Sequence, residues 1–154
     1  EHSTMLTDNI KTSIDESVLC WLATADNNGT PNCSPKEIFT YHNDSRLLIA
    51  NIASPESVAN IQANPEVCVS FVHVFKQKGF KIKGQAIYAD ANNEAFQEQI
   101  TLIQALAGDN FPVKGIIVIE ISSVKPIIAP GYYLTPGATE ESQIEGAKHT
   151  YGVK

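Results

Sequence analysis

The sequence predicts a mainly β protein with short helices, folded as a six-stranded antiparallel barrel or curled sheet. Six runs of strand length follow one another at hairpin spacing, and only two or three longer segments have the 3.6-residue period of a helix. Strands and helices do not alternate as they do in parallel sheets, and Gly-x-Gly-x-x-Gly is absent from the sequence. A Rossmann fold is therefore not supported.

Composition limits the class of protein. The chain has 154 residues, which suits one domain, and its 43% hydrophobic and 18% charged residues are ordinary for a soluble globular protein. A net charge of −6 argues against nucleic-acid binding, which needs basic surface. No apolar run approaches the roughly 18–20 residues of a membrane span. Three cysteines without a Cys-x-x-Cys pair indicate neither a disulfide framework nor zinc, so we expect a cytoplasmic protein.

The chain divides into a barrel domain and a tail. We place the barrel domain at residues 5–130 and a C-terminal arm, packed on the barrel or on a partner subunit, at residues 131–154. Prolines and glycines punctuate the start of this arm. Residues 1–4 precede the only methionine, Met5, and are expected to be a remnant of expression, so the fold argument begins at Met5.

Caps and turns bound the elements of the first half. Thr7 or Asp8 can cap a helix that has Ile10 and Ile14 at i, i+4 spacing and ends near residue 16. The Asn-Gly pair at 28–29 tolerates the positive φ angles of a hairpin turn. The strands expected here are residues 18–25, 32–41 and 46–51.

Breakers and caps also bound the elements of the second half. Pro65 ends a helix, because the residue before proline avoids the helical region. A longer helix has its last core position at Leu106 or Ala107, and Thr139 can cap a final one. The expected helices are 55–63, 92–106 and 139–148, and the expected strands are 67–74, 80–88 and 115–124.

Hydroxyl groups gather where the third strand becomes a helix. Ser54 suits the N-cap, Pro55 suits the first helical position, and Ser57 falls in the first turn. A helix N-terminus has unpaired N–H groups and a partial positive charge, so this junction could hold a phosphate. An ordinary helix cap is the alternative.

Lysines supply a second candidate site. Lys81 and Lys83 share one face of the expected 80–88 strand, just after Lys76 and Lys78, which suggests a small anionic ligand in an acidic protein. A solvated face that discourages edge pairing is the alternative. Lys36 lies inside an otherwise hydrophobic strand, where it is either part of an anion site or an exposed sheet residue.

Conventional catalytic sets are missing from the sequence. His42, His73 and His149 lack metal-ligand spacing, and there is no Gly-x-Ser-x-Gly motif. The three cysteines lie within expected strands, as small core residues do. If the protein is an enzyme, a bound cofactor is expected to carry the chemistry.

The ordered set of segments resembles the pyridoxamine 5′-phosphate oxidase-like family of FMN-binding split barrels. The likeness covers residues 15–125, and the Tyr-Gly-Val ending at 151–153 is similar to that of small flavin-binding members. The matching segments are the hairpin, Leu-Leu-Ile-Ala-Asn at 47–51, Ser-Pro-Glu-Ser at 54–57, Asn-Pro-Glu-Val-Cys-Val-Ser-Phe at 64–71 and Lys-Ile-Lys-Gly-Gln-Ala at 81–86. The resemblance implies a split β-barrel and a homodimer with two FMN sites at the subunit interface.

The resemblance also implies the residues that hold FMN. The strand at 48–52 would offer backbone groups to the flavin ring, and Ser54 and Ser57 would meet the phosphate. Lys36 is the one basic residue on the strand that carries the family's basic ligands, and the arginine-rich ending with which true oxidases grip pyridoxal phosphate is absent. The implied cofactor-binding residues are Ser34, Lys36, Ile49, Ala50, Asn51, Ser54, Ser57, Lys78 and Lys81.

We therefore expect an FMN-dependent oxidoreductase that acts on an unidentified small molecule, with no assigned catalytic residue and no metal. A non-catalytic flavin or small-anion binder, such as a stress-related protein, is the alternative from another class. A third possibility is another cofactor, a deazaflavin or haem, although no histidine is well placed for haem.

Overall fold

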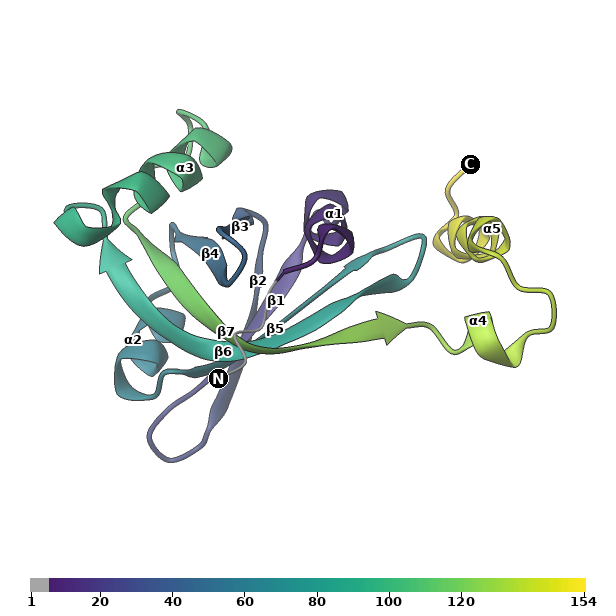
Figure 1. Cartoon of the computed structure of the whole chain (residues 1–154), viewed down its shortest axis with the longest axis horizontal. Coiled ribbons are helices and arrows are strands. Elements are labelled where there is room, and N and C mark those ends of the chain that lie inside the picture. Colours follow the sequence, from purple (N-terminus) through teal and green to yellow (C-terminus); the bar gives the residue numbers. More distant parts are fainter. Residues whose placement is uncertain (1–5) are drawn as a thin grey trace.

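The computed structural model describes residues 6–154 and consists of one seven-stranded antiparallel sheet flanked by helices (Figure 1). The expectation for residues 1–4 lies outside the described residues. The strand order is β2-β1-β5-β6-β7-β4-β3. The strands are β1 (Cys20–Ala25), β2 (Pro31–Lys36), β3 (Phe39–His42), β4 (Arg46–Asn51), β5 (Glu66–His73), β6 (Lys78–Asp90) and β7 (Gly115–Ile128). The predicted mainly β, antiparallel class is confirmed.

The predicted number of strands is wrong, because the strand expected at 32–41 is two strands. The chain bends at 37–38, and β2 and β3 on either side of this bend form the two edges of the sheet. The sheet must therefore curl until its edges approach each other. Within the described residues β2 and β3 share no ladder, although the Ala50 N–H donates to the Ile38 carbonyl at 2.9 Å. The barrel is split along this line.

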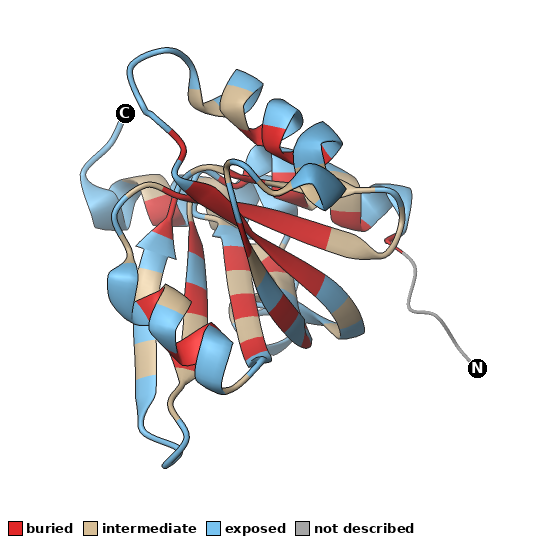
Figure 2. Ribbon diagram, turned by 90° about the vertical axis from the view of Figure 1, so that its left-hand side faces the viewer, coloured by how far each residue is buried: buried red, intermediate tan, exposed pale blue. Residues whose placement is uncertain are grey.

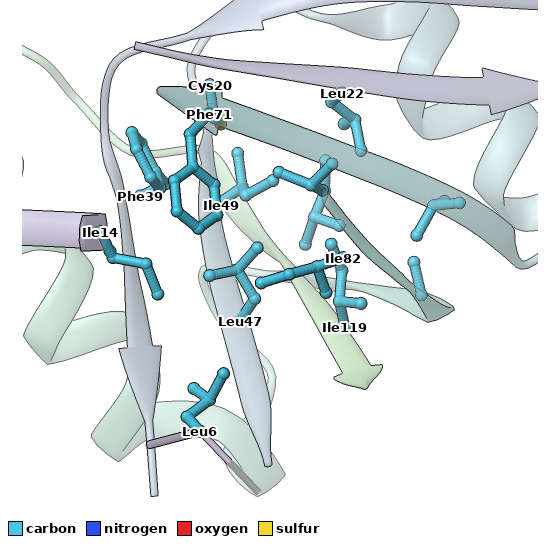
Figure 3. Close-up of a cluster of buried hydrophobic side chains, with 14 of the residues drawn as sticks. Leu6, Ile14, Cys20, Leu22, Phe39, Leu47, Ile49, Phe71, Ile82 and Ile119 are labelled. Carbon is cyan, nitrogen blue, oxygen red and sulfur yellow. The ribbon is translucent and has the colours of Figure 1, made fainter. Parts of the chain in front are cut away.

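Two apolar clusters hold the sheet. The larger one fills the inside of the curl, where side chains from opposing strands meet, as with Leu22, Leu47 and Ile82 (Figure 3). Burial alternates along the strands (Figure 2), so Ile82 is inside while Lys81 and Lys83 are exposed. This confirms the two faces predicted for the 80–88 strand. The smaller cluster lies under the helix that precedes β7.

The first and last helices begin at their predicted caps, whereas the helix expected at 92–106 is two segments: a 3-10 turn at Glu94–Phe96 capped by Asn93, and an α-helix that begins at Gln97. Thr7 accepts the Ile10 N–H at 3.3 Å at the start of the first helix, and Thr139 forms a capping box with Ser142 at the start of the last. None of the described helices is long and apolar enough to cross a membrane. The helices are α1 (Asp8–Glu16), α2 (Pro55–Ala63), η1 (Glu94–Phe96), α3 (Gln97–Ala107), α4 (Gly131–Leu134) and α5 (Glu140–Tyr151).

The C-terminal arm stands beside the sheet and touches the β5–β6 hairpin (Figure 1). The Tyr132 hydroxyl donates to the Lys76 carbonyl at 2.6 Å, and the Lys78 ammonium lies 4.2 Å from the centre of the Tyr132 ring. Glu140 pairs with Lys76 at 3.3 Å and with Lys78 at 3.5 Å. These contacts tie α4 and α5 to the hairpin.

Candidate functional site

One buried amide organises the turn from β4 into α2. The Asn51 Oδ1 accepts the Ser54 N–H at 3.1 Å, and the Asn51 Nδ2 donates to the Tyr88 hydroxyl at 3.1 Å. Ser54 is the N-cap residue of α2, as predicted, but its hydroxyl makes no bond to the helix. The Ser54 side chain is therefore directed to a different partner.

That partner is Lys36, the last residue of β2. Its ammonium donates to the Ser54 hydroxyl, and the side chain is buried with 8% exposure. Burial lowers the pKa of Lys36, and the Cys20 thiol opposes this with a smaller raising effect. Among the described residues Lys36 has no carboxylate partner. A buried ammonium with one hydroxyl partner is poorly compensated, so an anion would stabilise it.

A pair of serines lies next to this lysine. The Ser34 and Ser57 hydroxyls are 3.1 Å apart, and Ser57 is fully buried in the first turn of α2. One turn later the Asn60 Nδ2 donates to the Thr24 hydroxyl at 3.0 Å. These two contacts fix the start of α2 against β1 and β2, which brings its N-terminal N–H groups to the edge of the sheet.

A cavity of about 490 Å³ opens at this junction. Lys36, Ala50 and Ser54, three of the candidate cofactor-binding residues, line it. The opposite wall comes from the end of α3 and the loop after it. The lining residues are Val18, Pro35, Lys36, Glu37, Ile38, Ala50, Ile52, Ala53, Ser54, Leu106, Ala107 and Phe111. The cavity thus combines one buried cation with mainly apolar walls.

Two candidate residues on β4, Ile49 and Asn51, point away from the cavity. The Ile49 side chain is fully buried and points into the larger cluster (Figure 3). The Asn51 side chain is engaged by Ser54 and Tyr88. Neither side chain lines the cavity, so β4 presents Ala50 to it instead.

The other two candidate lysines lie elsewhere in the chain. Lys81 is exposed on β6, three strands from β2, which is about 14 Å along the sheet at ~4.8 Å per strand. Lys78 pairs with Glu140 and stacks on Tyr132. Within one chain the structure does not bring these lysines to Lys36.

The α3 wall is the part of the cavity that the sequence reasoning missed. Leu106 and Ala107 were alternatives for the last core position of this helix. Ala107 packs against the smaller cluster, whereas Leu106 is 54% exposed and faces the cavity. Phe111, in the loop after α3, is 51% exposed and lines the same cavity. The sequence signal that could have predicted this wall was a pair of large apolar residues, Leu106 and Phe111, at and just after the end of the helix.

The three cysteines are free thiols, and only Cys20 is a core residue. The prediction that all three are core residues is wrong for Cys33, which is exposed, and for Cys68, which is half-buried. Cys33 on β2 and Cys68 on β5 are both ladder partners of Ala23 on the strand between them. Two strand spacings place their Cα atoms about 9–10 Å apart, beyond the roughly 7 Å limit for a disulfide. Burial raises the pKa of the Cys20 thiol to about 12.

The curled sheet, open between its edge strands β2 and β3, defines a split-barrel protein. The family model for pyridoxamine 5′-phosphate oxidase matches residues 6–127. Because this match spans most of the chain, the chain belongs to the pyridoxamine 5′-phosphate oxidase family. No protein with a curated function matches the sequence.

Several solved structures share the fold. HupZ from Group A Streptococcus is 21% identical, with a TM-score of 0.67 over 78% of this chain and 92% of that chain. A putative pyridoxamine 5′-phosphate oxidase from Lactobacillus delbrueckii is 22% identical, with a TM-score of 0.66 over 80% of this chain and 96% of that one. An FMN-binding protein from Syntrophomonas wolfei is 16% identical, with a TM-score of 0.64 over 78% and 84%. At these identities the likeness establishes the fold alone.

Proposed function

We propose that this chain binds FMN in the Lys36–Ser54 cavity and acts as a flavin-dependent oxidoreductase on a small molecule. The observation that carries the proposal is the buried Lys36 ammonium, which has no described carboxylate partner and lines a cavity of about 490 Å³ at the start of α2. Lys36 and Ser54, which line the cavity, would hold the phosphate, and Ser34 and Ser57, which do not line it, would hold the start of α2 in place. Family membership and the FMN-binding protein that shares the fold support this choice of cofactor.

The chain's own residues would bind and orient the cofactor. Bound FMN supplies hydride and electron transfer. Ala50 on β4 lines the cavity, and the apolar walls would exclude water from a bound ring. Among the described lining residues the only ionisable side chains are Lys36 and Glu37. The protein would therefore position the cofactor and supply the charge beside it.

A titration with FMN tests the proposal. Purified protein is mixed with FMN, and flavin fluorescence and the absorbance band near 450 nm are recorded. We expect quenched fluorescence and a 1:1 stoichiometry per chain. A colourless protein that leaves flavin fluorescence unchanged at saturating FMN would refute the proposal.

We further propose that the protein is a cytoplasmic homodimer. Trp21, Val72 and Val74 are exposed apolar residues around a cavity of about 330 Å³ on β1 and β5, and a second copy would cover them. A second copy is also the remaining way to bring Lys78 and Lys81 to the FMN site. Light scattering that reports twice the chain mass of 16.7 kDa is the expected result.

A non-catalytic flavin binder is the second candidate function. It is favoured by the absence of Cys, His and Tyr side chains from the described lining of the cavity. Reduction of bound flavin by NADH or NADPH, followed by reoxidation by a second substrate, would favour the enzyme. Bound flavin that no nicotinamide reduces would favour the binder.

A further inference from the structure

A second, smaller cavity adjoins the candidate cofactor cavity. Its volume is about 260 Å³, and it shares the lining residues Val18, Glu37, Ile38 and Leu106 with the larger one. These shared residues come from the α1–β1 connection, the bend between β2 and β3, and the end of α3. The two cavities are therefore neighbouring compartments with these side chains as their common wall, and a molecule in the smaller one would lie beside this wall, close to a molecule in the larger.

The boundary between the compartments is apolar and exposed. Val18 has 79% of its surface exposed and Leu106 has 54%. Phe111, on the larger compartment, is 51% exposed. Exposed apolar side chains gathered at the mouth of a cavity are an unsatisfied binding surface. A ligand with an apolar body would bury them.

The charges of the compartments differ. Lys36 lines the larger compartment only. Around the smaller one the described lining residues include two carboxylates, Asp15 and Glu37, and no Lys, Arg or His. Neither carboxylate has an ion-pair partner among the described residues. Because Glu37 lines both compartments, the larger one has one cation and one carboxylate, and the smaller one has two carboxylates. An anionic group is therefore favoured near Lys36 and disfavoured in the smaller compartment.

We propose that the smaller compartment is the substrate site, and that it takes an apolar molecule whose polar group is neutral or positively charged, and not a phosphate or a carboxylate. This inference rests on the proposed function, because it assigns the larger compartment to FMN. It gives the chain a substrate class distinct from a phosphorylated vitamin. Ile38, Val18 and Leu106 supply the apolar contact, and Asp15 and Glu37 set the charge preference.

The test uses three probes with one apolar body: 2-naphthylmethylamine, 2-naphthylmethanol and 2-naphthoate. Calorimetry measures their affinity for the FMN-loaded protein at low ionic strength, where exposed charges are least screened. We expect the amine and the alcohol to bind, and naphthoate to bind at least about tenfold more weakly than the amine.

Charge variants locate the binding. Asp15→Lys should reverse the order of amine and naphthoate, and Glu37→Gln should shrink the amine's advantage by roughly threefold, which suits a partly solvated charge. Glu145→Lys, an equal charge change on exposed α5, is the control and should leave the ratio of affinities unchanged.

The outcomes separate the two proposals. A failed FMN titration overturns the proposed function and this inference with it. A normal FMN titration with naphthoate binding as tightly as the amine overturns this inference alone. So does an affinity ratio that Asp15→Lys does not change, because the probes would then bind elsewhere. A reversal in Asp15→Lys, with none in Glu145→Lys, supports the inference.

Discussion

At the scale of single residues, Lys36 is the position where stability and binding oppose each other. Its ammonium is buried, and it is satisfied by one hydroxyl. Removing a charge from water costs free energy that one neutral hydrogen bond does not fully return. Such a residue destabilises the protein without ligand and stabilises a complex with an anion.

The variant Lys36→Met should separate these two effects. Methionine keeps the length and apolar character of the lysine stem, so we expect the free energy of unfolding of the ligand-free protein to rise by about 1 kcal/mol. FMN affinity should fall about 10–100-fold, equivalent to the roughly 1.5–3 kcal/mol of a charge-assisted hydrogen bond. Urea unfolding and FMN titration measure the two quantities.

The same substitution has a predicted pH dependence. Burial lowers the folded-state pKa of Lys36 below its unfolded value of 10.5, so the unfolded chain binds more protons between these two pKa values. Wild-type stability therefore gains as the pH rises through this window. The advantage of Lys36→Met should be full below the folded-state pKa and shrink as the pH rises from there toward 10.5. An advantage that grows with pH would contradict the assignment.

Cys20 should be chemically silent in the folded protein. Its side chain has no exposed surface, and a thiol pKa of about 12 leaves almost no thiolate at pH 8. We expect a disulfide reagent such as dithionitrobenzoate to modify exposed Cys33 in native protein and Cys20 only after unfolding. Peptide mass spectrometry identifies the modified thiols, and Cys33→Ser is the control that removes the fast reaction. Native labelling of Cys20 at the rate of Cys33 would show that β1 is open to solvent.

At the scale of elements, the β4–α2 junction depends on Asn51 more than on the cap residue itself. The Ser54 hydroxyl makes no capping bond but is the partner of the Lys36 ammonium. In the Lys36→Met background, where that ammonium is absent, Ser54→Ala should therefore cost less than about 0.5 kcal/mol, below the ~1 kcal/mol typical of an N-cap. Asn51→Ala removes two buried hydrogen bonds and should cost roughly 1–3 kcal/mol.

Urea unfolding of the variants checks this order. Tyr88→Phe removes only one partner of Asn51 and should cost about 1 kcal/mol, between the other two. In the Lys36→Met background, equal losses from Ser54→Ala and Asn51→Ala would mean that the serine hydroxyl caps α2 after all. Ser54→Ala should still weaken FMN binding, because its hydroxyl accepts from Lys36.

The elements that the sequence predicted best are those set by local signals. β4 and α2 have the predicted bounds, because a turn, a proline and an Asn-Pro pair mark them. The bend between β2 and β3 was missed, since Glu37 and Ile38 carry no turn signal. That bend is fixed by the curling of the whole sheet, which local sequence does not encode.

The candidate site was also predicted only in part, since its local signals are visible in the sequence and its long-range contacts are not. The adjacent hydroxyls of α2 were visible in the sequence, and so was the lysine in an apolar strand. Their contact with each other depends on β2 and α2 meeting in space, which only the resemblance implied. The α3 wall was missed because both Leu106 and Ala107 fit the helical period of core positions. The sequence alone therefore did not show that Leu106 faces outward, toward the cavity.

At the scale of the whole molecule, the C-terminal arm has apolar surface that the barrel does not cover. Tyr132 is held against the β5–β6 hairpin, whereas Tyr133 and Leu134 are 70% and 71% exposed. Ion pairs from Glu140 to Lys76 and Lys78 fix the arm's position and leave these two side chains outward. Two neighbouring exposed apolar residues on an ordered arm suggest contact with a second copy.

Truncation after Ala129 should therefore weaken both dimer formation and FMN binding. A milder double variant, Tyr133→Ser with Leu134→Ser, keeps the Tyr132 and Glu140 contacts and removes only the outward apolar surface. If the arm binds the partner, this variant should also raise the dimer dissociation constant, by at least about tenfold for two buried apolar side chains. Light scattering across a concentration series and FMN titration on the same samples measure the effects. A wild-type protein of about 17 kDa at micromolar concentration that still holds FMN would contradict the proposed dimer, because the site would then be complete within one chain.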